Sequence, residues 1–248
     1  MTKDTKKRRE DVLAMIVAKY VETAEPVGSR FVAQRLGLSS ATIRNVMADL
    51  EDMGFVSHPH TSAGRVPTDK GYRYYIESLL PTKNLNEHTA KSIKDEYGRG
   101  VHSAEDVFEG AAHFISQLTN YVGMASFNDY HKLYMDGAFH MLEQPEFTDV
   151  KRVYALLKCL EEKKQIMQLL EHDAEGERLT VYIGKETGSG YLAECSIVTR
   201  GYKVKNKVAG KVGVIGPKRM LYEKVIPAVE FLADTMSEMM EQIENDRE

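Results

Sequence analysis

The chain has 248 residues, of which 42% are hydrophobic and 28% are charged, as is ordinary for a globular protein of one to three domains. It has no run of 18 apolar residues, which argues against a membrane span, and its charged start argues against a secretory signal, so we expect a cytoplasmic protein. The net charge of −4 is unevenly divided: residues 1–75 contain 12 Lys and Arg against 9 Asp and Glu, and the remainder contains 21 against 28. A basic N-terminal part before an acidic body suits a region that binds a polyanion.

Three helices are predicted in the first part of the chain. Apolar residues recur at helical spacing from about Arg9 to Glu22. Ser29 can then cap a short helix that ends at Leu36, and Ser39 can cap a third helix that Gly54 stops. Two short helices joined by a tight turn that contains glycine are typical of a helix-turn-helix.

A hairpin and a fourth helix are predicted next. Phe55 and Val56 resemble the start of a strand, residues 62–64 have turn chemistry, and the chain can return as a second strand at Arg65. Thr68 can cap a final helix that runs to about Leu80. Because a hairpin directly after a recognition helix is a wing, the pattern predicts a winged helix-turn-helix.

The rest of the chain predicts helices followed by strands and a long final helix. Periodicity indicates the helices, and β-branched runs bounded by glycine indicate the strands. The predicted elements are a linker at 81–84, helical structure at 85–120, an ambiguous stretch at 121–147, one helix at 148–172, strands at 179–184, 191–204 and 207–217, and a helix from about Arg219 to Ile243.

The helix after Ser39 is where a base sequence could be read. If its apolar stripe, which includes Ile43, faces the core, Ala41 and Asn45 lie opposite and Arg44 lies on one flank. Arg can bond guanine edges, Asn adenine edges, and Ala41 can meet a thymine methyl. The hydroxyls near the helix N-terminus suit phosphate oxygens. The candidates here are Ser39, Ser40, Ala41, Thr42, Arg44 and Asn45; the alternative is that Arg44 and Asn45 merely face water.

The predicted wing and the helix after it add a second group of candidates. Arg65 beside a glycine could reach a phosphate or the minor groove. His58 and His60 have no third ligand nearby, so we expect no metal site. The candidate backbone contacts are His58, His60, Arg65, Lys70 and Arg73.

No catalytic motif is visible. The sequence lacks a GxSxG nucleophile motif, a GxxxxGK phosphate loop and a CxxC pair. The two cysteines, Cys159 and Cys195, have no metal-ligand spacing and are expected to be reduced thiols in the interior. We therefore expect neither an enzyme nor a cofactor.

The segment from about Tyr20 to Tyr75 contains the long and specific blocks EPVGSR, SSATIRNVMADLE and HTSAGRVPTDKGYRYY. Over these blocks there is a nearly continuous resemblance to the family of the heat-inducible transcription repressor HrcA. It resumes in blocks that look like the family's GAF-like effector domain: LTNYVG (118–123), LEQPEF (142–147), CSIVT (195–199) and GVIGPKRMLYEKVI (213–226).

The segment between two of these blocks departs from the family. In typical members a long segment with a dimerising insertion separates TNYVG from LEQPEF, whereas here only the 18 residues from Met124 to Met141 do so. The resemblance implies a stress-response repressor of heat-shock and chaperone genes that binds an inverted-repeat operator. It also implies that the chaperonin GroEL helps to keep the repressor folded and active until heat or unfolded protein titrates the chaperonin.

The expected fold is α+β: a winged-helix DNA-binding domain (1–80), a helical linker region (81–117) and a reduced GAF-like α/β effector domain (118–248). We expect a homodimer, because a symmetric operator needs a two-fold protein. Its interface is expected among the helices after residue 84 and not in the strands; the candidates are the helix at 85–120, the helix at 148–172 and the final helix, with Met236, Met239 and Met240.

Two alternatives remain open at this point. The chain could be a winged-helix regulator that senses a small ligand, which a large apolar pocket within residues 118–220 would favour. It could instead be a protein-interaction module that has lost specific DNA binding, which a wing turned away from the recognition helix would favour.

Overall fold

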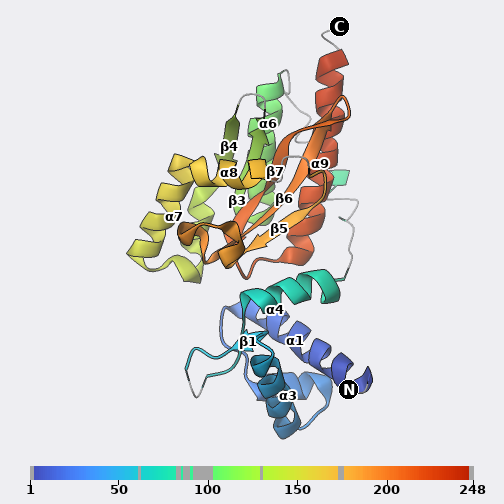
Figure 1. The fold of residues 1–248 in the computed structure, drawn as a ribbon, viewed down its shortest axis with the longest axis vertical. Coiled ribbons are helices and arrows are strands. Elements are labelled where there is room, and N and C mark those ends of the chain that lie inside the picture. The colour runs from blue at the N-terminus through green and yellow to red at the C-terminus, as the bar shows by residue number, and fades with distance from the viewer. Residues whose placement is uncertain are drawn as a thin grey trace. The chain divides into compact units, whose positions relative to one another are not determined.

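The computed structural model describes residues 3–60, 63–81, 85, 90–91, 103–128, 131–172 and 176–245. The chain divides into two compact units, Met1–Thr82 and Lys83–Glu248 (Figure 1). Much of the predicted helical linker region, 81–117, lies outside the described residues, so that region stays a prediction. Among the described residues, no helix is both long enough and apolar enough to cross a membrane.

The first unit has the predicted winged helix-turn-helix order. Its helices are α1 (Lys3–Thr23), α2 (Ser29–Leu36), α3 (Ser40–Asp52) and α4 (Asp69–Tyr74), which continues into the π-helical turn η1 (Tyr75–Leu79). Strands β1 (Val56–Ser57) and β2 (Val66–Pro67) pair antiparallel between α3 and α4. The first helix begins at Lys3 rather than near Arg9. The predicted Ser29 cap is wrong, because Ser29 is the first residue of α2 and the N-cap is Gly28, without a side-chain cap hydrogen bond.

Apolar residues at helical spacing build the core of this unit. Val12 and Ile16 of α1, Val32 of α2, and Ile43 and Leu50 of α3 are each at most 1% exposed. The turn between α2 and α3 is made by Gly37 in the left-handed region (φ 65°), which suits glycine because it has no Cβ. The predicted helix-turn-helix is therefore a packed unit.

The second unit is built on a five-stranded antiparallel sheet. Its strands are β3 (Val122–Phe127), β4 (Lys132–Asp136), β5 (Thr180–Ile183), β6 (Cys195–Val204) and β7 (Lys207–Pro217), in the order β4-β3-β7-β6-β5. The three predicted strands are present, but the one predicted to start at residue 191 begins at Cys195, because Gly190–Leu192 form a 3-10 turn. Strands β3 and β4 come from the stretch that the sequence left ambiguous, and the α+β fold class is confirmed.

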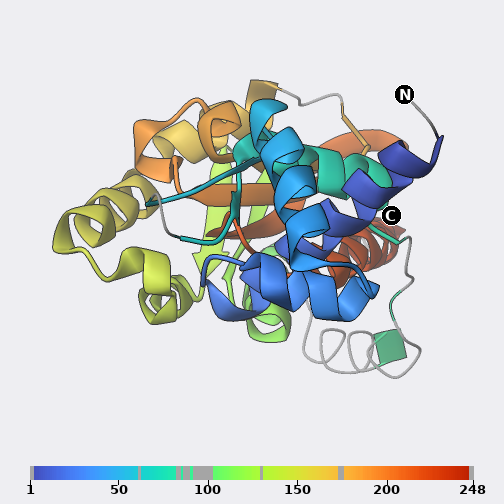
Figure 2. The ribbon, with the colours of Figure 1, turned by 90° about the horizontal axis from the view of Figure 1, so that it is seen from below.

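Helices cover both faces of this sheet, with α7 and α8 (yellow) opposite α6 (green) and α9 (red) (Figures 1 and 2). Helices α6 (Ala104–Thr119) and α9 (Tyr222–Asn245) pack on one face. Helices α7 (Val150–Glu162) and α8 (Lys164–His172) pack on the other, together with four short 3-10 segments. These segments are η3 (Ala138–Glu143), η4 (Pro145–Phe147), η5 (Gly184–Thr187) and η6 (Gly190–Leu192).

Two helix predictions in this unit are wrong in their boundaries. The single helix predicted at 148–172 is broken at Lys163, which has φ 55° and whose backbone N–H donates to the carbonyl oxygen of Cys159 at 3.1 Å. The Lys163 ammonium also donates to the carbonyl oxygen of Leu133 at 2.8 Å, which holds the break against β4. The final helix begins at Tyr222, not at Arg219.

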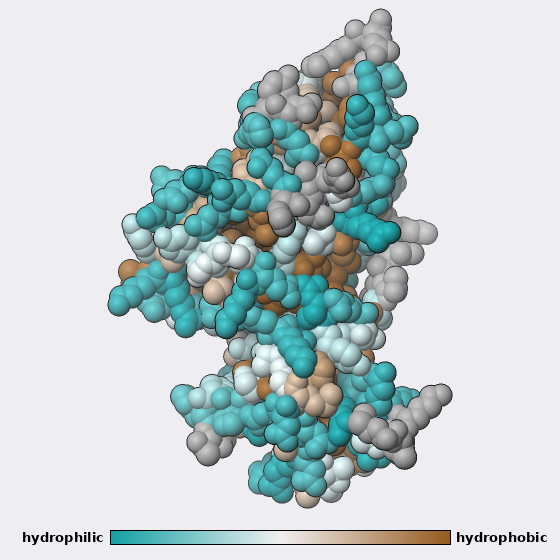
Figure 3. Space-filling model, viewed as in Figure 1, coloured by the Kyte–Doolittle hydropathy of each residue, from teal (hydrophilic) through white to brown (hydrophobic). Residues whose placement is uncertain are grey.

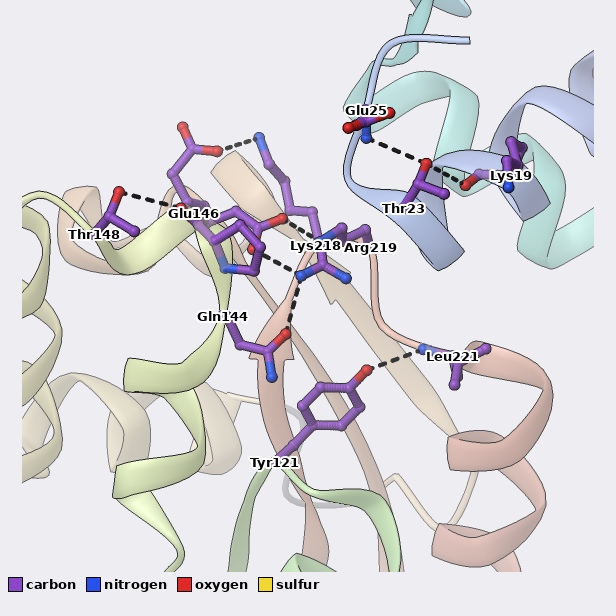
Figure 4. Close-up of polar contacts among 12 residues, drawn as sticks. Lys19, Thr23, Glu25, Tyr121, Gln144, Glu146, Thr148, Lys218, Arg219 and Leu221 are labelled. Atoms are coloured by element: carbon purple, nitrogen blue, oxygen red, sulfur yellow. Dashed lines mark hydrogen bonds and ion pairs between the residues drawn. The ribbon is translucent and has the colours of Figure 1, made fainter.

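The segment before α9 is held by polar contacts, which explains its later start (Figure 4). The Arg219 guanidinium donates to Glu146 at 2.5 Å and to Gln144 at 3.0 Å. The backbone N–H of Leu221 donates to the phenol oxygen of Tyr121 at 3.3 Å, and burial raises the pKa of that phenol. These contacts join the LEQPEF block to the end of β7.

Four side chains that the sequence singled out in this unit are buried: Cys159, Cys195, Met236 and Met240. Both cysteines are unpaired and buried, as expected, and burial raises the pKa of both thiols. Met236 of α9 is fully buried and Met240 is 4% exposed. These two methionines therefore belong to the core of the unit and do not form an open surface.

Candidate nucleic-acid interface

The recognition helix α3 has a well-defined start. The Ser39 hydroxyl accepts a hydrogen bond from the backbone N–H of Thr42 at 3.0 Å, which satisfies one of the unpaired donors at the helix N-terminus. The Thr42 hydroxyl lies 2.9 Å from the Ser39 hydroxyl. The predicted cap is therefore confirmed. The other backbone N–H groups at the N-terminus of α3 can bind an anion.

The two faces of α3 differ sharply. Its inner face is made of buried Ile43, Val46, Met47 and Leu50. On the outer face, Ala41, Arg44, Asn45 and Ala48 are exposed. Within the described part of the chain, no side-chain hydrogen bond or ion pair engages Arg44 or Asn45. The outer face thus presents one guanidinium and one amide between two small residues, which would allow a close approach to a flat partner.

The wing is fastened to the turn before α2. Arg65 and Val27 exchange two backbone hydrogen bonds, each of 2.9 Å. A Cβ on Gly64 would come within 2.5 Å of the Val27 carbonyl carbon, so only glycine permits this approach. The structure therefore places the wing stem next to the helix-turn-helix.

Glu51, near the end of α3, is a residue that the sequence did not single out. One of its carboxylate oxygens lies 2.7 Å from the Arg65 guanidinium, and the other contacts the ring Nδ1 of His58. Both stems of the wing are thus joined to the recognition helix through one carboxylate. No motif marks Glu51, because its partners are 7 and 14 positions away.

The remaining predicted backbone contacts are placed differently from one another. The Lys70 ammonium donates to the Met53 carbonyl oxygen at 2.8 Å and lies 4.8 Å from the centre of the Phe55 ring. Arg73 forms an ion pair with Glu77 at 3.5 Å. His60 is exposed on the wing. No group of three His, Cys, Asp or Glu side chains in the described residues is placed to hold a metal ion.

A second ion pair joins α3 to α1. The Arg9 guanidinium of α1 donates to one Asp49 oxygen from two nitrogens, at 2.6 and 3.1 Å. Such a two-donor contact fixes direction as well as distance. Glu10, which follows Arg9 in the sequence, accepts a hydrogen bond from the Tyr74 hydroxyl at 2.7 Å, and this hydrogen bond raises the pKa of the Tyr74 phenol. Arg9 therefore partly neutralises an acidic group on the recognition helix.

Two family models match the chain. The model described as "Winged helix-turn-helix transcription repressor, HrcA DNA-binding" matches residues 5–78, and the model of the HrcA protein C-terminal domain matches residues 125–226. A crystal structure described only as that of a hypothetical protein superposes with a TM-score of 0.80 at 21% identity, over 95% of this chain and 98% of that one. This likeness shows a shared fold.

Similar proteins extend over nearly the whole chain. The heat-inducible transcription repressor HrcA of Pelotomaculum thermopropionicum is 31% identical over 337 aligned positions that cover 95% of this chain and 97% of the relative, and that of Brevibacillus brevis is 30% identical over 333 positions, covering 94% and 97%. Because 95% of 248 residues is about 236, about 100 of the 337 positions face gaps in this chain. The chain is therefore a shortened member of the HrcA family of heat-inducible transcription repressors.

Proposed function

We propose that this chain represses transcription of heat-shock and chaperone genes by binding a specific operator sequence in double-stranded DNA. The observation that supports this most directly is the outer face of α3, where Arg44 and Asn45 are exposed and have no side-chain partner among the residues that the structure describes, on a helix that Ser39 caps. A helix of this kind enters the major groove with its N-terminal residues towards the bases. Arg44 would bond a guanine edge and Asn45 an adenine edge, while Ala41 would contact a thymine methyl.

The other candidates would position the protein on the DNA backbone. Ser40 and Thr42 lie in the first turn of α3, where N–H groups and the helix dipole favour a phosphate. On the wing and the helix after it, His58, His60, Arg65, Lys70 and Arg73 would supply sequence-independent contacts.

Membership of the family suggests the rest of the proposal. The operator would be an inverted repeat read by a homodimer, because each half-site takes one recognition helix. The repressor would act in the cytoplasm, without an enzymatic activity or a cofactor, and the chaperonin GroEL would be its partner in the response to heat.

The structure bears on the two alternatives. The groove around η5 and η6 has a volume of about 610 Å³ and is lined by polar side chains such as Gln165 and Glu186 together with Leu169 and Tyr191. A second groove, of about 550 Å³, is lined mostly by apolar side chains, among them Val122, Phe139 and Leu157. This second groove is the kind of feature that a small-ligand sensor would favour. The wing stem pairs with the body of its unit and does not turn away from α3. The position of the wing therefore favours DNA binding over a module that has lost it.

Selection of bound fragments from random double-stranded DNA, followed by sequencing, tests this proposal. We expect a palindromic consensus for the full chain, and for Arg44→Ala a consensus that is relaxed at one base position of each half-site. A matched control is Lys224→Ala, which removes an exposed positive charge from α9 in the other unit. If the full chain enriches no sequence, the proposed function is wrong. If a consensus survives in Arg44→Ala unchanged, α3 does not read the bases as proposed.

A further inference from the structure

Glu51 is an acidic residue on the flank of α3 that also carries Arg44. The two residues are seven positions apart, close to two helical turns of 3.6 residues, so they lie on the same side of the helix. A carboxylate so near a residue that would read DNA opposes binding, because it repels phosphates. Figure 3 shows a mostly hydrophilic face of the first unit, in its lower part, so charge is the main means by which this face attracts or repels DNA.

Two side chains of the wing bind this carboxylate. One oxygen of Glu51 lies 2.7 Å from Nη2 of Arg65, and the other oxygen contacts Nδ1 of His58. A guanidinium binds a carboxylate and a phosphate through the same donors, and an imidazole can contact either anion. The two wing residues therefore converge on an anion, and in the free protein that anion is the side chain of Glu51.

The contact with Glu51 uses only part of the Arg65 guanidinium. Its Nε is buried and has no hydrogen-bond partner among the residues that the structure describes. A buried donor without a partner carries a desolvation cost that a second acceptor oxygen would remove. The side chain of Arg65 is still 22% exposed, so an outside anion can reach it. The guanidinium is thus held in the free protein but is not fully satisfied.

The backbone at Arg65 places this group beside the start of α2. Arg65 pairs with Val27, and Val27 directly precedes Gly28, the N-cap residue of α2. In a helix-turn-helix, the first of the two helices crosses the DNA backbone while the second lies in the groove. A phosphate at the start of α2 would therefore lie close to the guanidinium that Glu51 now holds.

We propose that Arg65 and His58 form a binding site for one phosphate of the DNA backbone, and that Glu51 occupies this site in the free protein as an internal competitor. When DNA binds, the phosphate displaces the carboxylate. Because one anion is exchanged for another, the net gain is smaller than for a free guanidinium. Glu51 thereby lowers the affinity for every DNA sequence while it stabilises the free wing. This inference rests on the proposed function, since it requires DNA binding.

A purely structural role for Glu51 makes the opposite prediction. If the carboxylate only holds the wing in position and keeps its contacts on DNA, its loss misplaces the wing and weakens DNA binding. If Glu51 competes with a phosphate, its loss destabilises the first unit but strengthens DNA binding. The sign of the change in affinity therefore separates the two roles.

Glu51→Gln tests the proposal, because it keeps the shape of the side chain and removes the charge. Binding of the full chain to a duplex of random sequence is measured by fluorescence anisotropy at several chloride concentrations, without inorganic phosphate in the buffer. We expect binding about three- to tenfold tighter, with a steeper salt dependence, because Arg65 no longer exchanges one anion for another. The melting temperature should fall in the same variant.

The matched control is Asp52→Asn. Asp52 is the next residue of α3, is exposed, and forms no ion pair within the described part of the chain. Its substitution removes the same charge from nearly the same place, so it measures the general effect of less repulsion. Weaker binding by Glu51→Gln, or a gain no larger than that of Asp52→Asn, would overturn the proposal. Circular dichroism checks that each variant is folded.

A cycle with Arg65→Ala tests whether the contact is broken on binding. If a phosphate displaces Glu51, the gain from Glu51→Gln should be larger when Arg65 is present than in the Arg65→Ala background. Equal gains would mean that the pair is the same in free and bound protein, which would overturn the proposal.

A measurement on the unaltered chain does not depend on how Glu51→Gln folds. The Nε–H signal of Arg65 in a nitrogen-15 NMR spectrum, identified by its loss in Arg65→Ala, should shift when the duplex is added, and an unmoved signal would overturn the proposal. Absence of any duplex binding by the full chain would overturn the proposed function, and this inference with it. Normal binding without a gain in Glu51→Gln would overturn this inference alone.

Discussion

The recognition helix and the wing differ in how much of their binding capacity is already used inside the protein. On α3, the exposed Arg44 and Asn45 have no side-chain partner among the described residues. On the wing, Arg65 and His58 both contact Glu51, and beyond it Lys70 bonds a backbone carbonyl. The two regions look alike in sequence, since each has polar residues at positions that suit DNA.

This difference teaches that a basic residue in the right place is not necessarily available to a phosphate. A side chain that is already paired must either keep its partner on binding or exchange it, and exchange reduces the net gain. We therefore expect α3 to dominate affinity and specificity, and the wing to contribute mainly through its shape and position. The following substitutions test that division.

The largest expected effect is on α3. Arg44→Ala and Asn45→Ala should each weaken operator binding by about 1–3 kcal/mol, or about 5- to 150-fold, with relaxed preference at one base position. The reason is the loss of a bidentate base contact in each case. Fluorescence anisotropy with operator DNA and single-base variants of it measures both quantities. If neither substitution changes specific binding, α3 is not the recognition helix, and the proposed division between α3 and the wing is wrong.

The next effect concerns the carboxylate that joins the two regions. Glu51→Gln keeps the size of the side chain but removes its charge, so the half-buried pair with Arg65 is weakened. We expect a loss of about 1–2 kcal/mol in the free energy of unfolding of the first unit, typical for hydrogen bonds to charged groups. Urea unfolding of the full chain measures it. Glu22→Gln is the matched control, because its pair with Lys19 is exposed and should contribute at most about 0.5 kcal/mol. Equal losses in the two variants would show that Glu51 does not brace the wing.

A smaller effect is expected at Arg65. Arg65→Ala should lower affinity for all DNA sequences alike, by a few-fold, and reduce the slope of log affinity against log salt by about 1, as one lost phosphate contact does. Binding isotherms at several salt concentrations measure the slope. An unchanged slope with weaker binding would mean that Arg65 only holds the wing in place. A loss confined to some sequences would mean that it reads a base or the groove shape.

The smallest effect is expected at Lys70. Its ammonium already bonds the Met53 carbonyl oxygen and lies over the Phe55 ring. Lys70→Gln should therefore cost about 0.5–1 kcal/mol of stability, and its effect on DNA affinity should be weaker than that of Arg65→Ala. Thermal unfolding measures the stability, and binding isotherms at several salt concentrations measure the affinity and its salt slope. If Lys70→Gln lowers the salt slope as much as Arg65→Ala, the lysine leaves Met53 to reach a phosphate.

Local patterns predicted most of the first unit. The apolar stripe of α3 and the caps at Ser39 and Thr68 depend on neighbours a few residues apart, and the structure confirms each of them. The contacts of Glu51 and Gly64 could not be predicted, because they join segments that only folding brings together. Which of the predicted DNA contacts act is still a prediction.

In the second unit, the sequence predicted strands only where β-branched residues are frequent. Strand β3 reads VGMASF, with a single β-branched residue, and its partner β4 begins with a charged one, so neither showed a strand pattern. The break between α7 and α8 is made by Lys163, a residue without the signature of a helix end. Its ammonium is held by β4, so tertiary structure and not local preference ends the helix.

The close approach at Gly64 has a consequence for the genetics of such a repressor. A side chain at Gly64 would meet the Val27 backbone at 2.5 Å, and one at Gly71 would meet the Phe55 carbonyl oxygen at 2.1 Å. Neither glycine can contact a base through a side chain, yet almost any missense change at either codon would push the wing off its support. A screen for cells that express the controlled genes constitutively should therefore recover lesions at these two codons alongside those on α3. Such alleles would look like DNA-contact mutants in the cell, although their defect is one of architecture.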